Sequence, residues 1–129
     1  MSESPDGLRY TEEHEYLMAT DESGVYRVGI TDYAQGELGD VVYVELSDAG
    51  QSFEKRASFG TIEAVKAVSD LYCPVAGEIV GVNESLENDP SSVNDDPYGA
   101  GWMIRLRVDD EAEVDALLDA AAYRALVGE

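Results

Sequence analysis

Apolar and polar residues alternate along the first two-thirds of the chain, and this period of two predicts a mainly β protein. Segment 88–97 is rich in turn residues and is expected to be a loop. The run 62–71 contains no Gly, Pro or Asn, so the pattern alone places no hairpin tip at Lys66. The expected strands are Tyr16–Ala19, Val25–Ile30, Val41–Val44, β-rich stretches within 58–73 and 77–83, and a half-buried strand at 102–108.

Capping residues predict short helices, two of them at the C-terminus. Thr31 is expected to cap a helix over 32–38, which Gly39 would end. Asp110, with Glu113 three residues later, has the pattern of a capping box, and Asp119 is expected to begin a second terminal helix. Many short strands followed by this helical appendage, about 110–127, predict a β-sandwich or barrel.

Length and charge limit the range of functions. The 129 residues fit one domain, 1–129, and 8 Lys+Arg against 28 Asp+Glu give a net charge of −20. So few cations argue against binding to nucleic acid or to an anionic membrane. No uncharged run exceeds the eight residues 97–104, whereas a membrane span needs about 20. The N-terminus is no signal peptide, and a lone Cys73 fits a reducing cytoplasm.

The excess of acidic residues raises the question of the salt concentration in which the protein works. Carboxylates at this density repel one another, and the Debye length falls to about 3 Å only near 1 M salt. A salt-rich cytoplasm would make the composition tolerable, and an acidic protein of ordinary cytoplasm is the alternative. If the first explanation holds, the melting temperature rises steeply with KCl; an unchanged value from dilute buffer to molar KCl contradicts it.

Conventional catalytic and metal sites find little support. His14 is the single histidine, so a zinc site could draw at most on His14 and Cys73 among the usual ligands, and no metal is expected. A small hydrolase that uses His14 and carboxylates stays open as a distant alternative. A Cys73–His14 nucleophilic pair is disfavoured, because a cysteine within a strand-like run is more often buried.

Lysine is the informative residue type, since the chain has only Lys55 and Lys66. Lys66 is flanked by Ala-Val on both sides, with Glu63 three residues before it and Asp70 four after. From spacing alone, a surface lysine on a strand is the favoured interpretation.

The whole chain resembles the H-protein family of the glycine cleavage system. Departures are few: Tyr16 stands where a tryptophan is usual, and basic positions are thinned. Together the motifs are highly specific and span roughly residues 8–126. The matching stretches are 10–15, 29–35, 38–46, FGTIEAVKAVSDLY at 59–72, Pro74, 77–78, 82–83, Asn94, 97–98 and 101–104.

The resemblance implies a flattened β-barrel or sandwich of the lipoyl-domain, or barrel-sandwich hybrid, type. Lys66 would carry lipoate in amide linkage at the exposed tip of a hairpin within 58–73, and Glu63 would be recognised by the lipoate-attaching enzyme. Biotin carriers are the nearest rival, but they have methionines beside the lysine, where this chain has Val65 and Ala67.

The resemblance also implies a monomeric cytoplasmic carrier that is not itself an enzyme. Its partners would be a pyridoxal-phosphate glycine decarboxylase, a tetrahydrofolate-dependent aminomethyltransferase and a dihydrolipoyl dehydrogenase. A related carrier that relays lipoyl groups to 2-oxoacid dehydrogenases is the alternative. In this family the loaded arm folds back against the protein, and Glu15, with His14 and Asp70, is the candidate cleft for its ammonium group.

Overall fold

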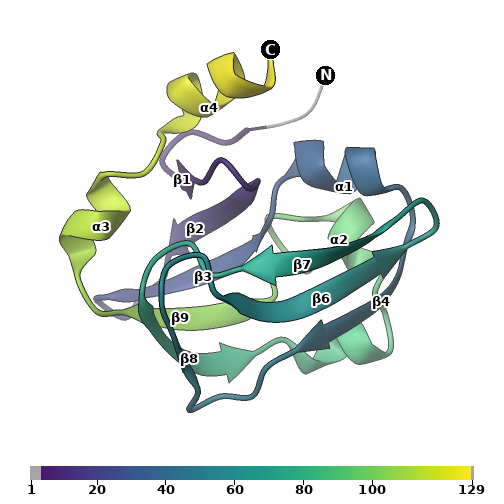
Figure 1. Ribbon diagram of the computed structural model, residues 1–129, viewed down its shortest axis with the longest axis horizontal. Coiled ribbons are helices and arrows are strands. Elements are labelled where there is room, and N and C mark those ends of the chain that lie inside the picture. Colours follow the sequence, from purple (N-terminus) through teal and green to yellow (C-terminus); the bar gives the residue numbers. More distant parts are fainter. Residues whose placement is uncertain (1–3, 129) are drawn as a thin grey trace.

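The computed structural model describes residues 4–128, which form two β-sheets packed face to face with short helices around them (Figure 1). The larger sheet has the order β1-β2-β3-β9-β8-β5, and the smaller one has the order β4-β6-β7. The strands are β1 (Arg9–Tyr10), β2 (Glu15–Ala19), β3 (Val25–Ile30), β4 (Val41–Leu46), β5 (Ser52–Phe53), β6 (Ser58–Ala64), β7 (Val68–Tyr72), β8 (Gly77–Val82) and β9 (Ile104–Val108).

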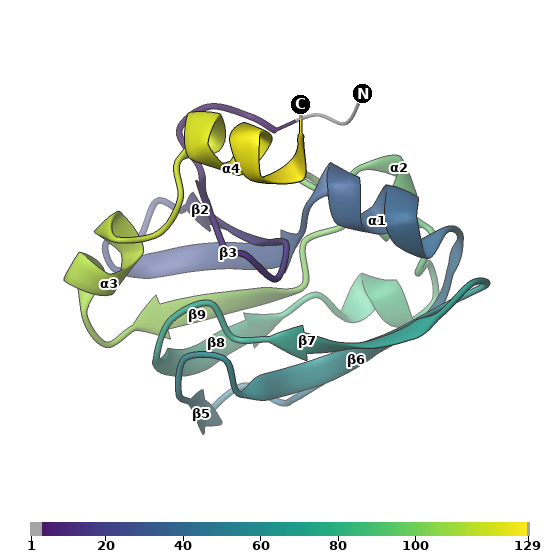
Figure 2. The same cartoon turned by 45° about the horizontal axis from the view of Figure 1, so that its top comes forward.

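The helices lie at the rim of the sandwich (Figure 2). They are α1 (Asp32–Leu38), the 3-10 helix η1 (Glu84–Glu87), α2 (Ser92–Asp95), α3 (Glu111–Asp115) and α4 (Ala120–Val127). Within residues 4–128, no helix is long and apolar enough to cross a membrane.

The predicted fold class is confirmed in its sandwich form: the protein is mainly β, and its two sheets do not close into a barrel. Strand 25–30 and helix 32–38 have the predicted bounds, and Thr31 accepts a hydrogen bond from the amide of Ala34 as an N-cap. Asp119 likewise caps α4. Local propensity and capping therefore decide these elements.

Two local predictions were wrong. Segment 88–97 is not all loop, because α2 lies within it; Asp89 accepts hydrogen bonds from the Ser91 and Ser92 hydroxyls, and such residues begin helices as readily as turns. The capping box at Asp110 is only half present. Asp110 caps the amide of Ala112, but Glu113 accepts a hydrogen bond from the amide of Ala76 instead of the Asp110 amide.

The main core lies between the two sheets, where side chains such as Val28, Ile104 and Leu106 of the large sheet belong to one cluster with Val44 and Ile62 of the small sheet. A second, smaller cluster joins α4 to β1 and β2. At its centre the rings of Tyr10 and Tyr123 are stacked, with centroids 4.6 Å apart. The C-terminal helix is thus fixed to the edge of the large sheet, next to the segment that bears His14.

Candidate functional site

Lys66 lies in the turn between β6 and β7, a hairpin that projects beyond the rest of the small sheet (Figures 1 and 2). The turn is closed by a hydrogen bond of 2.8 Å from the Ala64 amide to the Ala67 carbonyl. The Lys66 side chain is exposed, and Val65 beside it is 73% exposed. An amine at this position is open to a macromolecular partner.

The turn at Lys66 rests on the segment that joins α1 to β4. The Val65 amide donates to the Asp40 carbonyl at 2.9 Å. The aliphatic part of the Lys66 side chain covers Gly39, whose φ is +83°; a Cβ at Gly39 would lie 3.4 Å from three of the lysine carbons. Glycine supplies both the backbone conformation and the space for the lysine. These contacts give the lysine a defined starting direction.

Asn94 of α2 fixes the segment that joins α1 to β4 by side-chain hydrogen bonds. Its side chain accepts from the Val41 amide at 2.8 Å and donates to the Gly39 carbonyl at 2.9 Å. It also contacts Gln35 of α1. Local sequence patterns predicted no structural role for Asn94, because its partners lie more than 50 positions away.

A cleft of about 270 Å³ opens beside the lysine, between α1, β2 and β7. It brings together three of the residues singled out from the sequence, Glu15, His14 and Asp70. Leu38 lines the cleft, and the next residue, Gly39, touches Lys66. Glu13 and Glu37 add further carboxylates, and no Lys or Arg lines it. Such surroundings favour a cationic ligand.

Glu63 is placed elsewhere. It is exposed on β6, where it pairs with Tyr43 on one side and Val68 on the other, and it does not line the cleft. Lys66 also lies outside the lining. The predicted residues therefore form two groups, one on the hairpin and one in the cleft.

Glu15 is the buried acid of the cleft, with a residue exposure of 2%. The Thr11 hydroxyl donates to its carboxyl group at 2.9 Å, and the Tyr72 amide donates at 3.4 Å. Desolvation outweighs these hydrogen bonds and raises the pKa of Glu15 to about 8. At neutral pH the side chain is therefore largely protonated, and a cation entering the cleft would draw it toward the carboxylate form.

His14 is held in an uncommon backbone conformation, with φ of +72°, which non-glycine residues adopt mainly where tertiary contacts enforce it. Its Nδ1 lies 2.8 Å from the Tyr123 hydroxyl, and that hydroxyl is 2.7 Å from the Thr31 hydroxyl. Burial lowers the pKa of His14, so the ring is neutral at pH 7. The C-terminal helix thus positions a residue of the cleft.

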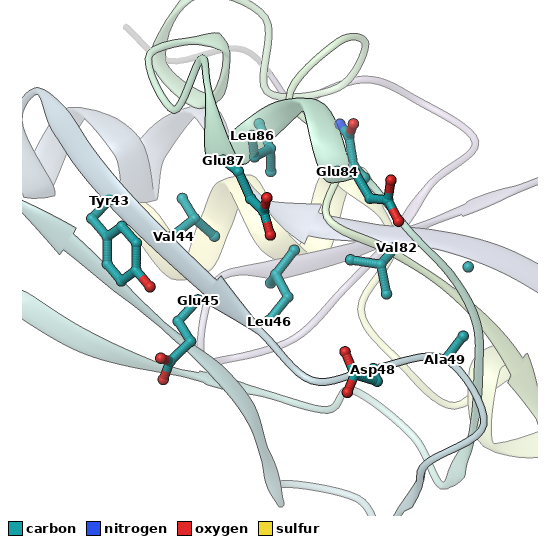
Figure 3. Close-up of a pocket in the computed structure, with 12 residues that line it drawn as sticks. Tyr43, Val44, Glu45, Leu46, Asp48, Ala49, Val82, Glu84, Leu86 and Glu87 are labelled. Atoms are coloured by element: carbon teal, nitrogen blue, oxygen red, sulfur yellow. The ribbon is translucent and has the colours of Figure 1, made fainter.

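A second and more spacious cavity, of about 590 Å³, lies elsewhere (Figure 3). Leu46, Val82 and Leu86 contribute apolar side chains to it, while Glu84 and Glu87 add carboxylates at its edge (Figure 3). None of the residues singled out from the sequence lines it.

Cys73 behaves as a small apolar residue. Its thiol is buried and donates to the Val75 carbonyl, and burial raises its pKa to about 12. At neutral pH it is a thiol, which is a poor nucleophile. Within residues 4–128, no three His, Cys, Asp or Glu side chains are grouped so as to hold a metal ion.

Comparison with known proteins gives a single answer over the full chain. The family model described as "Glycine cleavage H-protein" matches residues 8–129. A glycine cleavage system H protein of Chlorobium limicola is 54% identical over 97% of this chain and 98% of that protein. The one of Chromohalobacter salexigens is 51% identical over 98% and 96%. The crystal structure of the Mycobacterium marinum protein matches with a TM-score of 0.87 at 37% identity, over 97% and 99% of the two chains.

Proposed function

The chain belongs to the glycine cleavage H-protein family, and from that premise we propose that Lys66 bears lipoate and that the protein shuttles the aminomethyl group of glycine between enzymes. The observation that carries the proposal is an exposed lysine at the tip of a hairpin whose turn is held by Asp40 and Gly39. Bound in amide linkage, lipoate would supply a dithiolane that carries the group and exchanges two electrons.

The residues around Lys66 suit such a group. Ala64 and Ala67 are small and leave the lysine room to move, and Lys66 itself is exposed in the turn. Glu63, exposed on the same hairpin, is proposed as part of the surface that the lipoate-attaching enzyme recognises. A hairpin presents one lysine at a defined height, whereas Lys55 lies in a polar stretch outside the named strands.

The cleft is proposed to receive the loaded end of the arm. Glu15 and Asp70 would face the ammonium of the aminomethyl group, with His14 at the same cleft. Because the empty cleft favours protonated Glu15, entry of a cation would release its proton and leave a buried ion pair. Enclosure in the cleft would also keep water from the labile group.

The proposed partners are the pyridoxal-phosphate decarboxylase, the tetrahydrofolate-dependent aminomethyltransferase, the dihydrolipoyl dehydrogenase and the lipoate-attaching enzyme. The protein would catalyse no step itself. Its contribution would be tethering, which brings the arm to millimolar effective concentration near a docked enzyme. Relay of lipoyl groups to 2-oxoacid dehydrogenases is the alternative role.

Intact-mass measurement after expression with lipoate tests the attachment. We expect one lipoyl group on the wild-type protein and on Lys55→Arg, and none on Lys66→Arg. Modification that persists in Lys66→Arg would disprove the assignment. Reconstitution with the decarboxylase and aminomethyltransferase then separates glycine cleavage from lipoyl relay, which needs neither enzyme.

The lifetime of the loaded form tests the cleft. Glu15→Ala should be lipoylated as fully as the wild type but should lose the aminomethyl group faster, because its ammonium has lost the carboxylate and water can enter. Glu12→Ala, an exposed acid three positions earlier, is the matched control. Equal lifetimes for wild type and Glu15→Ala would remove Glu15 from this role.

A further inference from the structure

Basic residues gather on one face of the large sheet. Three of the eight Lys and Arg lie there: Arg27 on β3, and Arg105 and Arg107 on β9. Their neighbours along the strands, among them Ile104 and Leu106, are buried in the core between the sheets. Because side chains alternate along a strand, the arginines point to the opposite, outer face. This face therefore concentrates positive charge on a protein whose net charge is −20.

Two of these arginines lie directly opposite each other on adjacent strands. Arg27 and Arg105 are direct partners in the antiparallel pairing of β3 with β9, and like charges at such positions are destabilising. Trp102 lies beside both, with the guanidinium carbons of Arg27 and Arg105 5.4 and 5.1 Å from its ring centroid. Cation–π attraction to the ring offsets part of the repulsion and holds both side chains.

Neither arginine of this pair is neutralised. Among the residues that the structure describes, no carboxylate lies within ion-pair distance of Arg27 or Arg105, although the chain has 28 Asp and Glu. Arg107 differs, since it pairs with Glu22 at 3.4 Å and with Glu78 at 3.9 Å. Two guanidinium groups are thus left available to a partner.

The same face is hollowed rather than flat. Cavities of about 380 and 240 Å³ share Arg105, with Val80 contributing an apolar wall to the first and Met18 to the second. Asp21 lines both. A surface that combines guanidinium groups without a carboxylate partner, an aromatic ring and apolar hollows has the composition of a protein contact site, where Arg and Trp are enriched.

We infer that the face formed by Arg27, Trp102 and Arg105 docks an acidic surface segment of one of the enzymes that the carrier serves. The inference rests on the proposed function. Charge complementarity is the reason: elsewhere the acidic surface repels an acidic partner, whereas these two cations attract one and fix its orientation.

The position of this face suits a carrier. Strand β9 begins at the end of the large sheet that lies toward α2 and the hairpin tip (Figures 1 and 2). The docking face lies on the outer side of the large sheet, whereas Lys66 belongs to a hairpin of the small sheet. An enzyme held there leaves the lysine uncovered.

The test uses lipoylated Arg27→Gln, Arg105→Gln and the double variant, with Lys55→Gln as a control that removes one exposed charge elsewhere. KM and kcat are measured with the decarboxylase, the aminomethyltransferase and the dihydrolipoyl dehydrogenase of the same organism, in dilute buffer and in molar KCl. We expect KM for at least one enzyme to rise roughly fivefold for each arginine removed, because each loss breaks one exposed ion pair with the partner; kcat should be unchanged. The difference should shrink in molar KCl, and Lys55→Gln should match the wild type.

Other outcomes overturn the inference. Unchanged KM values with all three enzymes would do so, as would an equal rise for Lys55→Gln, which would indicate a general charge effect. Direct titration with inorganic phosphate and with a single-stranded oligonucleotide identifies another occupant if binding is lost in Arg105→Gln while every KM stays constant. A wild-type protein that is not lipoylated, or that serves none of the enzymes, refutes the carrier function as well; the other results refute only the docking face.

Discussion

Lys66 and Glu15 belong to neighbouring parts of the molecule with opposite surroundings. The hairpin that bears Lys66 is held by backbone contacts at its turn and leaves its functional group in solvent. The cleft is held by side chains and buries Glu15, a residue that is 2% exposed. The first arrangement keeps an amine accessible, and the second makes protonation of an acid depend on what occupies the site.

The position of the Lys66 amine and the protonation of Glu15 are set by different means. On the hairpin, the supporting residues decide only where the amine lies. In the cleft, desolvation changes the chemistry of the group and raises the pKa of Glu15 to about 8. Substitutions in the segment that supports the turn should therefore alter stability and attachment, whereas substitutions in the cleft should alter how stability depends on pH.

The largest effect is expected for Glu15→Gln. Because the pKa of Glu15 rises from about 4.5 unfolded to about 8 folded, the folded wild type binds the extra proton and loses stability as pH rises across that interval. The variant lacks this loss, so its free energy of unfolding should exceed that of the wild type by an amount that grows to about 3 kcal/mol between pH 5 and pH 8. Urea unfolding at several pH values measures it. Glu12→Gln, at an exposed position, is the control, and a constant difference for Glu15→Gln would contradict the desolvated acid.

Asn94→Ala should come next, with a loss of about 2.5 kcal/mol, because the Val41 amide and the Gly39 carbonyl both lose their partner. The turn beneath Lys66 should loosen, and lipoylation should slow. Chemical denaturation and a time course of attachment measure the two effects. Asn88→Ala, at an exposed position, is the control. Wild-type stability in Asn94→Ala would show that the turn holds without α2.

Gly39→Ala should cost about 2 kcal/mol, since its backbone conformation, φ +83° and ψ −161°, is reserved for glycine and an added methyl would touch the Lys66 side chain. Gly36→Ala is a matched control within α1, where a Cβ meets no atom within 4 Å. That variant should instead gain about 1 kcal/mol from helix propensity. Thermal unfolding of both distinguishes the positions; a stabilised Gly39→Ala would contradict the strain.

The smallest effect is expected for Tyr123→Phe. Loss of its hydroxyl leaves His14 and the buried Thr31 without that partner, at about 1 kcal/mol, while the stacked ring is kept. The lifetime of the aminomethyl-loaded form should shorten if His14 needs this contact. Tyr26→Phe provides a control hydroxyl outside the cleft lining. An unchanged stability would show that the α4 contact is dispensable.

Short-range signals made much of this fold predictable. Strand 25–30, helix 32–38 and the Asp119 cap follow from patterns within a few residues. The hairpin at Lys66 does not, because its turn has no turn residues and is stabilised instead by the Asp40 carbonyl, 25 positions earlier. Only resemblance to a family pointed to that lysine.

The cleft was still harder to foresee. Its histidine is positioned by Tyr123, 109 residues away along the chain, and no local pattern contains that pairing. Burial of Glu15 depends on how β2 packs against β7, which also lies outside any local window. Residue types could therefore suggest the members of the cleft, but their protonation required the tertiary structure.

Trp102 has a practical consequence, since it is the single tryptophan of the chain and lies beside two arginines. Excitation selective for indole therefore reports on one side of the molecule alone. Binding of a macromolecule at Trp102 should shift the fluorescence emission of the indole. Lipoylation of Lys66 should leave that spectrum unaltered. The protein thus contains its own optical probe, and no dye needs to be attached.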